Sequence, residues 1–263
     1  MRMFTVVMIL LALTVSVSYS QQYFARESFI YPMGDTLGGQ GTAGNGWGGP
    51  WYWDGSHWWG EGLTNKISEI PLAYNDMLYP VTNIGNHTTF YTPGNWVGGL
   101  SHMRDLDKTW PNVAGKVYWI SFVYDPEPGV AITDNSYFIV KLFKDTQELL
   151  AIGKGGGTPN YTCGSGWPGV TGDDVSAIPC EGGPVWLVTA IYMSGDTLSR
   201  TFMWINPDPT AGAPDTNVAD VKRWTNGING FNKISIEGGG ADSAYVNYDE
   251  IRLGDSWDAV ALP

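Results

Sequence analysis

The chain has 263 residues, with 26 aspartates and glutamates against 14 lysines and arginines, for a formal net charge of −12. So acidic a protein is a poor partner for nucleic-acid phosphates, which require a basic surface. Only 15% of the residues are charged, whereas 35 are glycine and 16 are proline, a balance typical of β-rich, turn-rich proteins.

The first residues have the pattern of a secretory signal peptide. Arg2 provides a positive charge, residues 4–15 are apolar, and the small residues of 16–20 precede a cleavage point near Gln21. The apolar stretch is too short for a spanning helix, although an uncleaved anchor is the alternative. We expect a signal peptide over residues 1–21. The mature chain, residues 22–263, is expected to be secreted or held at the cell surface, without membrane insertion.

A run of tryptophans follows, interrupted by glycines that favour a loop over a regular strand or helix. Indoles on a loop either pack over a sheet edge or contact a ligand. We expect Trp47 and Trp51 to be buried, since they lie in the architectural frame GWGGPW. The trailing half is the predicted ligand-binding site, in which three indoles stack on sugar rings and three polar side chains form hydrogen bonds. These residues are Trp53, Trp58 and Trp59 with Asp54, His57 and Glu61.

Short segments rich in aromatic and β-branched residues predict strands along the rest of the chain. In chain order they are 24–29, 88–91, 116–124, 136–143, 149–153, 185–193, 201–205, 233–236 and 244–253. Several have apolar residues at both odd and even positions, which indicates strands covered on both faces. A hairpin is expected across residues 194–196, and a short helix over 215–224 with Asp215 as its N-cap.

The two cysteines, Cys163 and Cys180, lie in a glycine- and proline-rich segment, residues 153–184, which we interpret as a surface excursion. A disulfide between them is the expectation for an oxidising compartment, with free thiols or a metal site as the alternatives. Many short strands separated by glycine and proline turns predict a jelly-roll β-sandwich of two antiparallel sheets, in a single domain over residues 22–263.

Four short segments carry a resemblance to a known group. They are residues 27–32 (ESFIYP), 46–51 (GWGGPW), 204–207 (WINP) and 249–253 (DEIRL). Together they resemble bacterial secreted proteins with a concanavalin A-like, laminin-G-like jelly roll, over roughly residues 27–260. The resemblance implies two packed sheets, one often concave, and a carbohydrate-binding or adhesive role. The chain stops soon after the DEIRL segment, so we expect free secretion or non-covalent retention.

Catalysis is the least supported interpretation. Laminarinase-like relatives of this fold use an E-x-D-x-x-E strand, and no glutamate here has an aspartate two positions later. His102 and Arg104 could form a lyase site, although the three histidines lie in loop-like sequence and are expected to be solvated. Glu250 shares a strand face with Arg252 and is expected to form an ion pair rather than a catalytic site.

The leading prediction is therefore a non-catalytic protein that binds a polysaccharide or cell-surface polymer. A structural, self-assembling matrix, surface-layer or fibre protein is the alternative, with a glycan-degrading enzyme behind both. Acidic turns leave a structural calcium ion open, without a distinct set of ligands. Asn86 and Asn160 begin N-glycosylation sequons, whose use depends on the organism.

Overall fold

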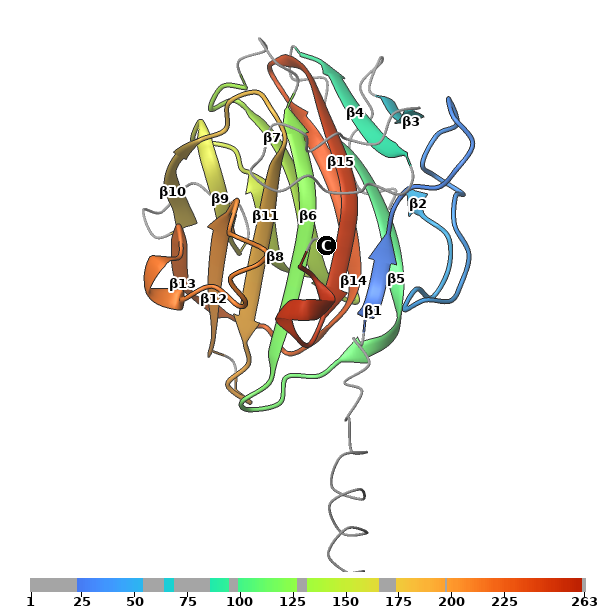
Figure 1. Ribbon diagram of the computed structural model, residues 1–263. Helices are drawn as coiled ribbons and strands as arrows, with labels where there is room; N and C mark the ends of the chain where they lie inside the picture. Colours follow the sequence, from blue (N-terminus) through green and yellow to red (C-terminus); the bar gives the residue numbers. More distant parts are fainter. Residues whose placement is uncertain are drawn as a thin grey trace, which may run out of the picture.

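The computed structural model describes residues 23–53, 64–68, 86–94, 99–126, 132–165, 174–196 and 198–261. In these ranges the chain folds into two antiparallel sheets that pack face to face (Figure 1). The predicted all-β jelly-roll sandwich is thus confirmed. None of the helices in the described ranges is long and apolar enough to cross a membrane.

The eight-stranded sheet faces the viewer in Figure 1. Its strands are β1 (Tyr23–Glu27), β3 (Thr64–Ser68), β4 (His87–Pro93), β6 (Val117–Pro126), β11 (Val185–Tyr192), β12 (Leu198–Ile205), β13 (Val221–Asn226) and β15 (Ser243–Gly254). They lie in the order β13-β12-β11-β6-β15-β4-β3, and β1 pairs with the C-terminal residues 251–254 of β15. The edge strands β13 and β3 therefore stand at opposite ends of this sheet.

The seven-stranded sheet lies behind it. Its strands are β2 (Tyr52–Trp53), β5 (Gly99–Trp110), β7 (Ser136–Lys144), β8 (Gln147–Lys154), β9 (Asn160–Gly164), β10 (Val175–Pro179) and β14 (Phe231–Gly240). Their order is β10-β9-β8-β7-β14-β5-β2. The chain crosses between the sheets after β1, β2, β4, β5, β6, β10, β13 and β14, so most strand pairs join segments distant in sequence.

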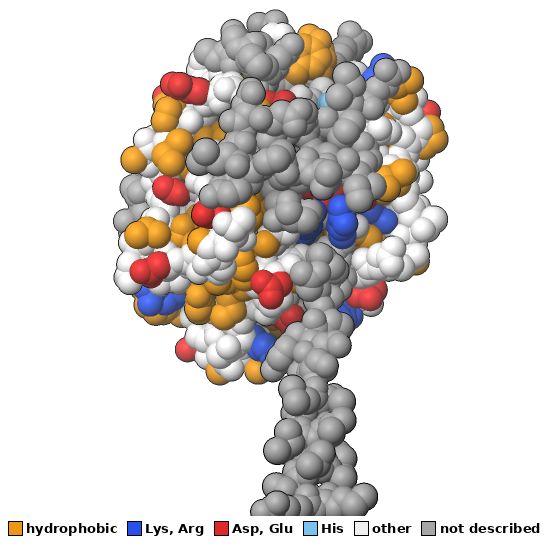
Figure 2. Space-filling view, in the orientation of Figure 1, with side chains coloured by type: hydrophobic (Ala, Val, Ile, Leu, Met, Phe, Trp, Pro, Cys, Tyr) orange, Lys and Arg blue, Asp and Glu red, His pale blue; other side chains and the backbone are white. Residues whose placement is uncertain are grey.

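Two apolar clusters explain why several strands are hydrophobic on both alternations. The larger one fills the space between the sheets. The second lies on the outer face of the eight-stranded sheet, where Trp119, Trp186 and Trp204 pack with Trp257 of the short helix η3 (Trp257–Ala259). Hydrophobic side chains are visible over β11 and β12 on this face (Figure 2). Because the C-terminal residues cover part of the outer face, its strands are buried on both sides, as their sequences predict.

The predicted strands all occur, and the hairpin between β11 and β12 forms across residues 194–196. Of the one or two helical turns expected within residues 215–224, one forms. Asp215 accepts a hydrogen bond from the Asn217 N–H and caps a single 3-10 turn, η2 (Thr216–Val218). The chain then enters β13, because pairing with β12 satisfies its backbone groups better than an isolated short helix would.

The segment 153–184 is part of the seven-stranded sheet, through β9 and β10, rather than a surface excursion. The predicted Cys163–Cys180 disulfide is not formed, and both cysteines are free and buried. Strand register explains this. The Cys180 N–H donates to the Pro159 carbonyl at 2.9 Å, and Cys163 lies four residues, or about 13 Å, further along β9. A disulfide requires Cα atoms within about 7 Å.

Candidate functional site

The first polar cluster is built around Glu27, at the end of β1. One carboxylate oxygen accepts the Phe29 N–H at 2.7 Å. The other accepts the Tyr31 hydroxyl at 2.6 Å, the Trp51 indole N–H at 3.0 Å, and the guanidinium of Arg104 on β5. Burial, reinforced by the adjacent carboxylate, raises the pKa of Tyr31, so its hydroxyl stays protonated and donates. The ESFIYP segment is thus an anchor between β1 and β5.

The Arg104 guanidinium is likewise bound on all sides by groups of the protein itself. Its Nε donates to the Gly49 carbonyl at 2.9 Å and its Nη2 to the Thr42 carbonyl at 3.1 Å. The guanidinium carbon also lies 4.4 Å from the centre of the Trp47 ring. Trp47 and Trp51 are buried, which confirms their predicted architectural role. The guanidinium therefore holds the glycine-rich loop against β5 and is not free for a substrate.

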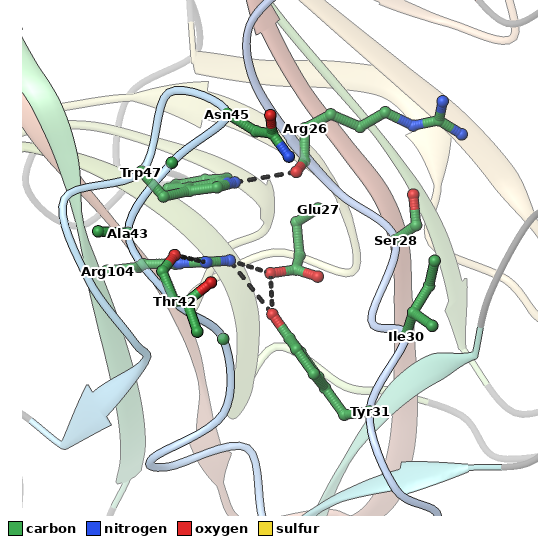
Figure 3. Close-up of a pocket in the computed structure, with 12 residues that line it drawn as sticks. Arg26, Glu27, Ser28, Ile30, Tyr31, Thr42, Ala43, Asn45, Trp47 and Arg104 are labelled. Atoms are coloured by element: carbon green, nitrogen blue, oxygen red, sulfur yellow. Dashed lines mark hydrogen bonds and ion pairs between the residues drawn. The ribbon is translucent and has the colours of Figure 1, made fainter.

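A cleft of about 520 Å³ opens above this cluster (Figure 3). Its rim carries Arg26, Ser28, Ile30 and Asn45, from β1 and the two loops that follow. Arg26 is paired with the buried Glu250 at 2.9 Å, and Glu250 also binds Arg252 at 2.9 Å. The predicted Glu250–Arg252 ion pair is confirmed. Each charged residue that lines the cleft is thus already held in an ion pair within the protein, although Arg26 and Arg252 share the single carboxylate of Glu250.

The second site lies at the edge of the seven-stranded sheet, where β2 pairs with β5. The Tyr52 hydroxyl donates to the Asp105 carboxylate at 3.0 Å, and the Lys233 ammonium lies 5.4 Å from the centre of the Tyr52 ring. Partial burial raises the pKa of Tyr52, with Lys233 opposing this shift and Asp105 reinforcing it. The hydroxyl is therefore protonated at neutral pH.

Asp105 and Lys233 line an open groove of about 560 Å³ at this edge. We call it the β2–β5 groove. Two carboxylates, two ammonium groups, two threonine hydroxyls and one carboxamide face it. They belong to Asp105, Asp145, Lys108, Lys233, Thr109, Thr146 and Asn232. The charges balance, and the remaining groups can donate and accept hydrogen bonds, so the groove suits a neutral, hydroxyl-rich ligand.

Of the six residues of the predicted ligand-binding site, the structure describes only Trp53. It lies on β2 next to Tyr52 and is 39% exposed. The other five, Asp54, His57, Trp58, Trp59 and Glu61, fall in residues 54–63, outside the described part of the chain. The sequence did not point to Tyr52, Asp105 or Lys233, because they meet only through the pairing of β2 and β14 with β5.

A buried row of polar residues crosses the same sheet on its outer face. The Lys141 ammonium lies 2.7 Å from Glu237 and 2.8 Å from Glu148, which joins β7, β8 and β14. Burial lowers the pKa of Lys141, but the two carboxylates outweigh it and the net shift is upward. One ammonium is shared by two carboxylates and bridges three strands. This arrangement is suited to holding strands together and not to the separate acid and base roles of a glycosidase.

The lyase arrangement considered for His102 and Arg104 is not formed. Both side chains lie on the inner face of β5. His102 packs edge-on to Phe90 at 6.2 Å between ring centres, and its Nδ1 is 3.4 Å from the Asn65 side-chain amide. His102 and His87 are buried in strands, which corrects the expectation that they are solvated. Arg104 lines the cleft of Figure 3, but its guanidinium is held by Glu27 and two backbone carbonyls, and His102 is not among the residues that line that cleft.

The sequence also left open a metal site and N-linked glycans on two sequons. In the described ranges no group of three histidine, cysteine, aspartate or glutamate side chains is placed to hold a metal ion. The sequon amides of Asn86 and Asn160 are half-buried and donate to the carbonyls of Tyr31 at 3.0 Å and Ser176 at 2.8 Å. A glycan on either asparagine would have to break that bond.

No protein-family model matches the chain, and no curated protein is similar to it. Solved structures are similar in fold. The globular domain of T. cruzi calreticulin matches with a TM-score of 0.51 at 11% identity, over 89% of this chain and 88% of that one. An endo-β-1,4-glucuronan lyase from the fungus Trichoderma reesei has a TM-score of 0.44 at 12% identity, over 78% and 97%. The carbohydrate recognition domain of Emp46p has a TM-score of 0.38 at 12% identity, over 67% and 85%. At such identities the likeness concerns the fold alone, and that fold is a concanavalin A-like β-sandwich.

Proposed function

We propose that this protein is a secreted, non-catalytic carbohydrate-binding protein, and that it binds neutral glycan in the β2–β5 groove. The observation that carries the proposal is the Tyr52 ring, which is bonded to Asp105 and contacts Lys233 beside a groove of balanced charge. An aromatic ring at such a position stacks on the apolar face of a sugar ring. The hydroxyls of the same sugar then find donors and acceptors in Asp105, Lys233 and Asn232.

Secretion follows from the signal-like residues 1–21 and is part of the proposal. Mass spectrometry of the chain recovered from culture medium tests it, with a mature N-terminus near Gln21 or Gln22 expected. An intact N-terminus in a membrane fraction would contradict it.

The binding proposal is tested by affinity electrophoresis of the full mature chain through gels that contain neutral polysaccharides. We expect retardation by at least one of them, and a loss of affinity of roughly two- to tenfold in Tyr52→Ala, because aromatic contacts contribute about 0.5–1.5 kcal/mol. Tyr245→Ala is the matched control, since it removes the same side chain from β15 of the other sheet. Its affinity should equal that of the wild type.

Two results would overturn the proposal. One is equal retardation of the wild type and Tyr52→Ala in every retarding gel. The other is the absence of any retardation together with concentration-dependent assembly in sugar-free buffer, which would favour the structural, self-assembling alternative.

A further inference from the structure

The starting observation is an arginine without a partner. Four described arginines are paired with carboxylates: Arg26, Arg104, Arg223 and Arg252. Arg200, on β12, is exposed, and in the described part of the chain it has neither a hydrogen bond nor an ion pair. In these ranges its guanidinium instead makes cation–π contacts with two aromatic rings. In an acidic protein such a guanidinium is available to an outside anion.

Strand pairing holds Arg200 in place. It lies directly opposite Trp224 on β13 and Tyr192 on β11, so the three side chains form one row on the outer face of the eight-stranded sheet. The guanidinium carbon is 4.9 Å from the centre of the Trp224 ring and 5.0 Å from that of Phe202. Phe202 is itself fixed by burial and by edge-on packing against Tyr192. The charged group is thus ordered before any ligand arrives, which lowers the entropy cost of binding.

The face around Arg200 is basic and aromatic. Trp224 is 56% exposed, the largest exposed fraction among the described tryptophans. Lys222, also exposed, lies opposite Phe202 in the next row. Basic and hydrophobic side chains lie beside one another at this edge of the molecule (Figure 2). We call Tyr192, Arg200, Phe202, Lys222 and Trp224 the Arg200–Trp224 face.

The acidic residues nearest in sequence are engaged by other groups. The Asp196 carboxylate accepts from the Ser194 hydroxyl and the Leu198 N–H, and the Asp220 carboxylate from the Ile205 N–H. Neither aspartate forms an ion pair with Arg200 or Lys222 in the described part of the chain. These two cations therefore remain on this face for an outside anion, despite the net charge of −12.

We propose that the Arg200–Trp224 face binds an acidic polysaccharide, with a uronate carboxylate on the Arg200 guanidinium and a sugar ring on the Trp224 indole. Guanidinium and carboxylate match in a bidentate geometry that an ammonium does not offer. A uronate combines that carboxylate with a flat sugar ring, so one residue of the polymer satisfies both side chains. This site is separate from the β2–β5 groove and does not depend on it.

The experiment measures the affinity of the full mature chain for polygalacturonate and for its fully methyl-esterified form, which keeps the ring but loses the charge. We expect binding to the acid form, at least tenfold weaker binding to the ester, and at least tenfold weaker binding of the acid form by Arg200→Gln. Arg200→Lys should recover only part of the affinity. Lys66→Gln removes one exposed positive charge at the opposite end of the same sheet and should bind like the wild type.

Three outcomes would overturn the proposal: no binding of polygalacturonate, equal binding of acid and ester, or equal loss in Arg200→Gln and Lys66→Gln. Trp224→Ala separates a sugar from a bare anion. If Trp224→Ala has no effect and inorganic polyphosphate binds through Arg200 equally well, the site recognises anionic charge and not a uronate. Tyr52→Ala should leave polygalacturonate binding unchanged, so the two proposed sites can fail independently. Because Arg200 and Trp224 are exposed, circular dichroism of both variants should match the wild type.

Discussion

The substitution Glu27→Gln tests the buried anchor between β1 and β5. It preserves the shape of the side chain but replaces one acceptor oxygen with an amide nitrogen that cannot accept a hydrogen bond. It also leaves the Arg104 guanidinium buried without its counter-charge. At least one of the Phe29, Tyr31 and Trp51 donors loses its partner as well.

The expected cost follows from the burial of both partners. Removing one member of a buried ion pair costs about 3–5 kcal/mol, because an uncompensated charge remains inside. For a chain of this size that corresponds to a fall in Tm of roughly 6–20 °C. Urea unfolding followed by tryptophan fluorescence measures the change in the free energy of unfolding.

Two further variants make the test specific. Glu181→Gln, at an exposed position, should change the free energy of unfolding by less than about 0.5 kcal/mol. Arg104→Met in the Glu27→Gln background removes the stranded charge, so the double variant should lose less than the sum of the two single losses. A loss below about 1 kcal/mol for Glu27→Gln, or strict additivity, would refute the assignment of Glu27 as a charged anchor.

Three other predictions concern the interior. The Lys154 ammonium is buried among the carbonyls of 133, 136 and 155, and burial lowers its pKa to about 8. Between pH 8 and 10.5 the unfolded chain then binds more protons than the folded one, so the free energy of unfolding should rise with pH more steeply than in Lys154→Met; equal slopes would contradict this. Burial raises the pKa of Cys163 to about 12 and of Cys180 to about 11. Iodoacetamide should therefore label neither thiol in the native protein, and both in urea without reductant. The absence of labelling in urea would indicate a disulfide. In Gly230→Ala the new Cβ would lie 2.3 Å from the Trp110 carbonyl oxygen, at a φ of +88°. We expect thermal unfolding to show a loss of about 1–3 kcal/mol in the free energy of unfolding. Wild-type stability would contradict this.

Strand prediction worked where the signal was local and failed where it depended on a distant partner. Segments such as residues 116–124 and 185–193 are rich in aromatic and β-branched side chains, and they form β6 and β11. The twelve-residue strand β5 was missed because its sequence, GLSHMRDLDKTW, carries charges at positions that face the core. Arg104 is acceptable there only because Glu27, 77 residues away in sequence, supplies the opposite charge.

The candidate sites show the same division. The sequence pointed to the tryptophan run, of which Trp53 lies on β2 but projects from the face opposite to Tyr52, while residues 54–63 stay a prediction. Asp105 and Lys233 join Tyr52 through the register of three strands, and Arg200 meets Trp224 through the register of β12 and β13. No sequence spacing predicts such pairs, because residues opposite each other in a sheet can be any number of residues apart in the chain.

By itself the sequence determined the class of fold, the positions of most strands, the burial of Trp47 and Trp51, and the ion pair of Glu250 with Arg252. Each of these rests on hydrophobic periodicity, turn chemistry or strand alternation within a few residues. The tertiary structure alone decided that Cys163 and Cys180 lie too far apart for a disulfide, that Glu27 neutralises Arg104, and that Arg200 stands unpaired beside Trp224. These outcomes depend on which strands pair and in which register, and that is settled by the burial of the whole core and not by any one segment.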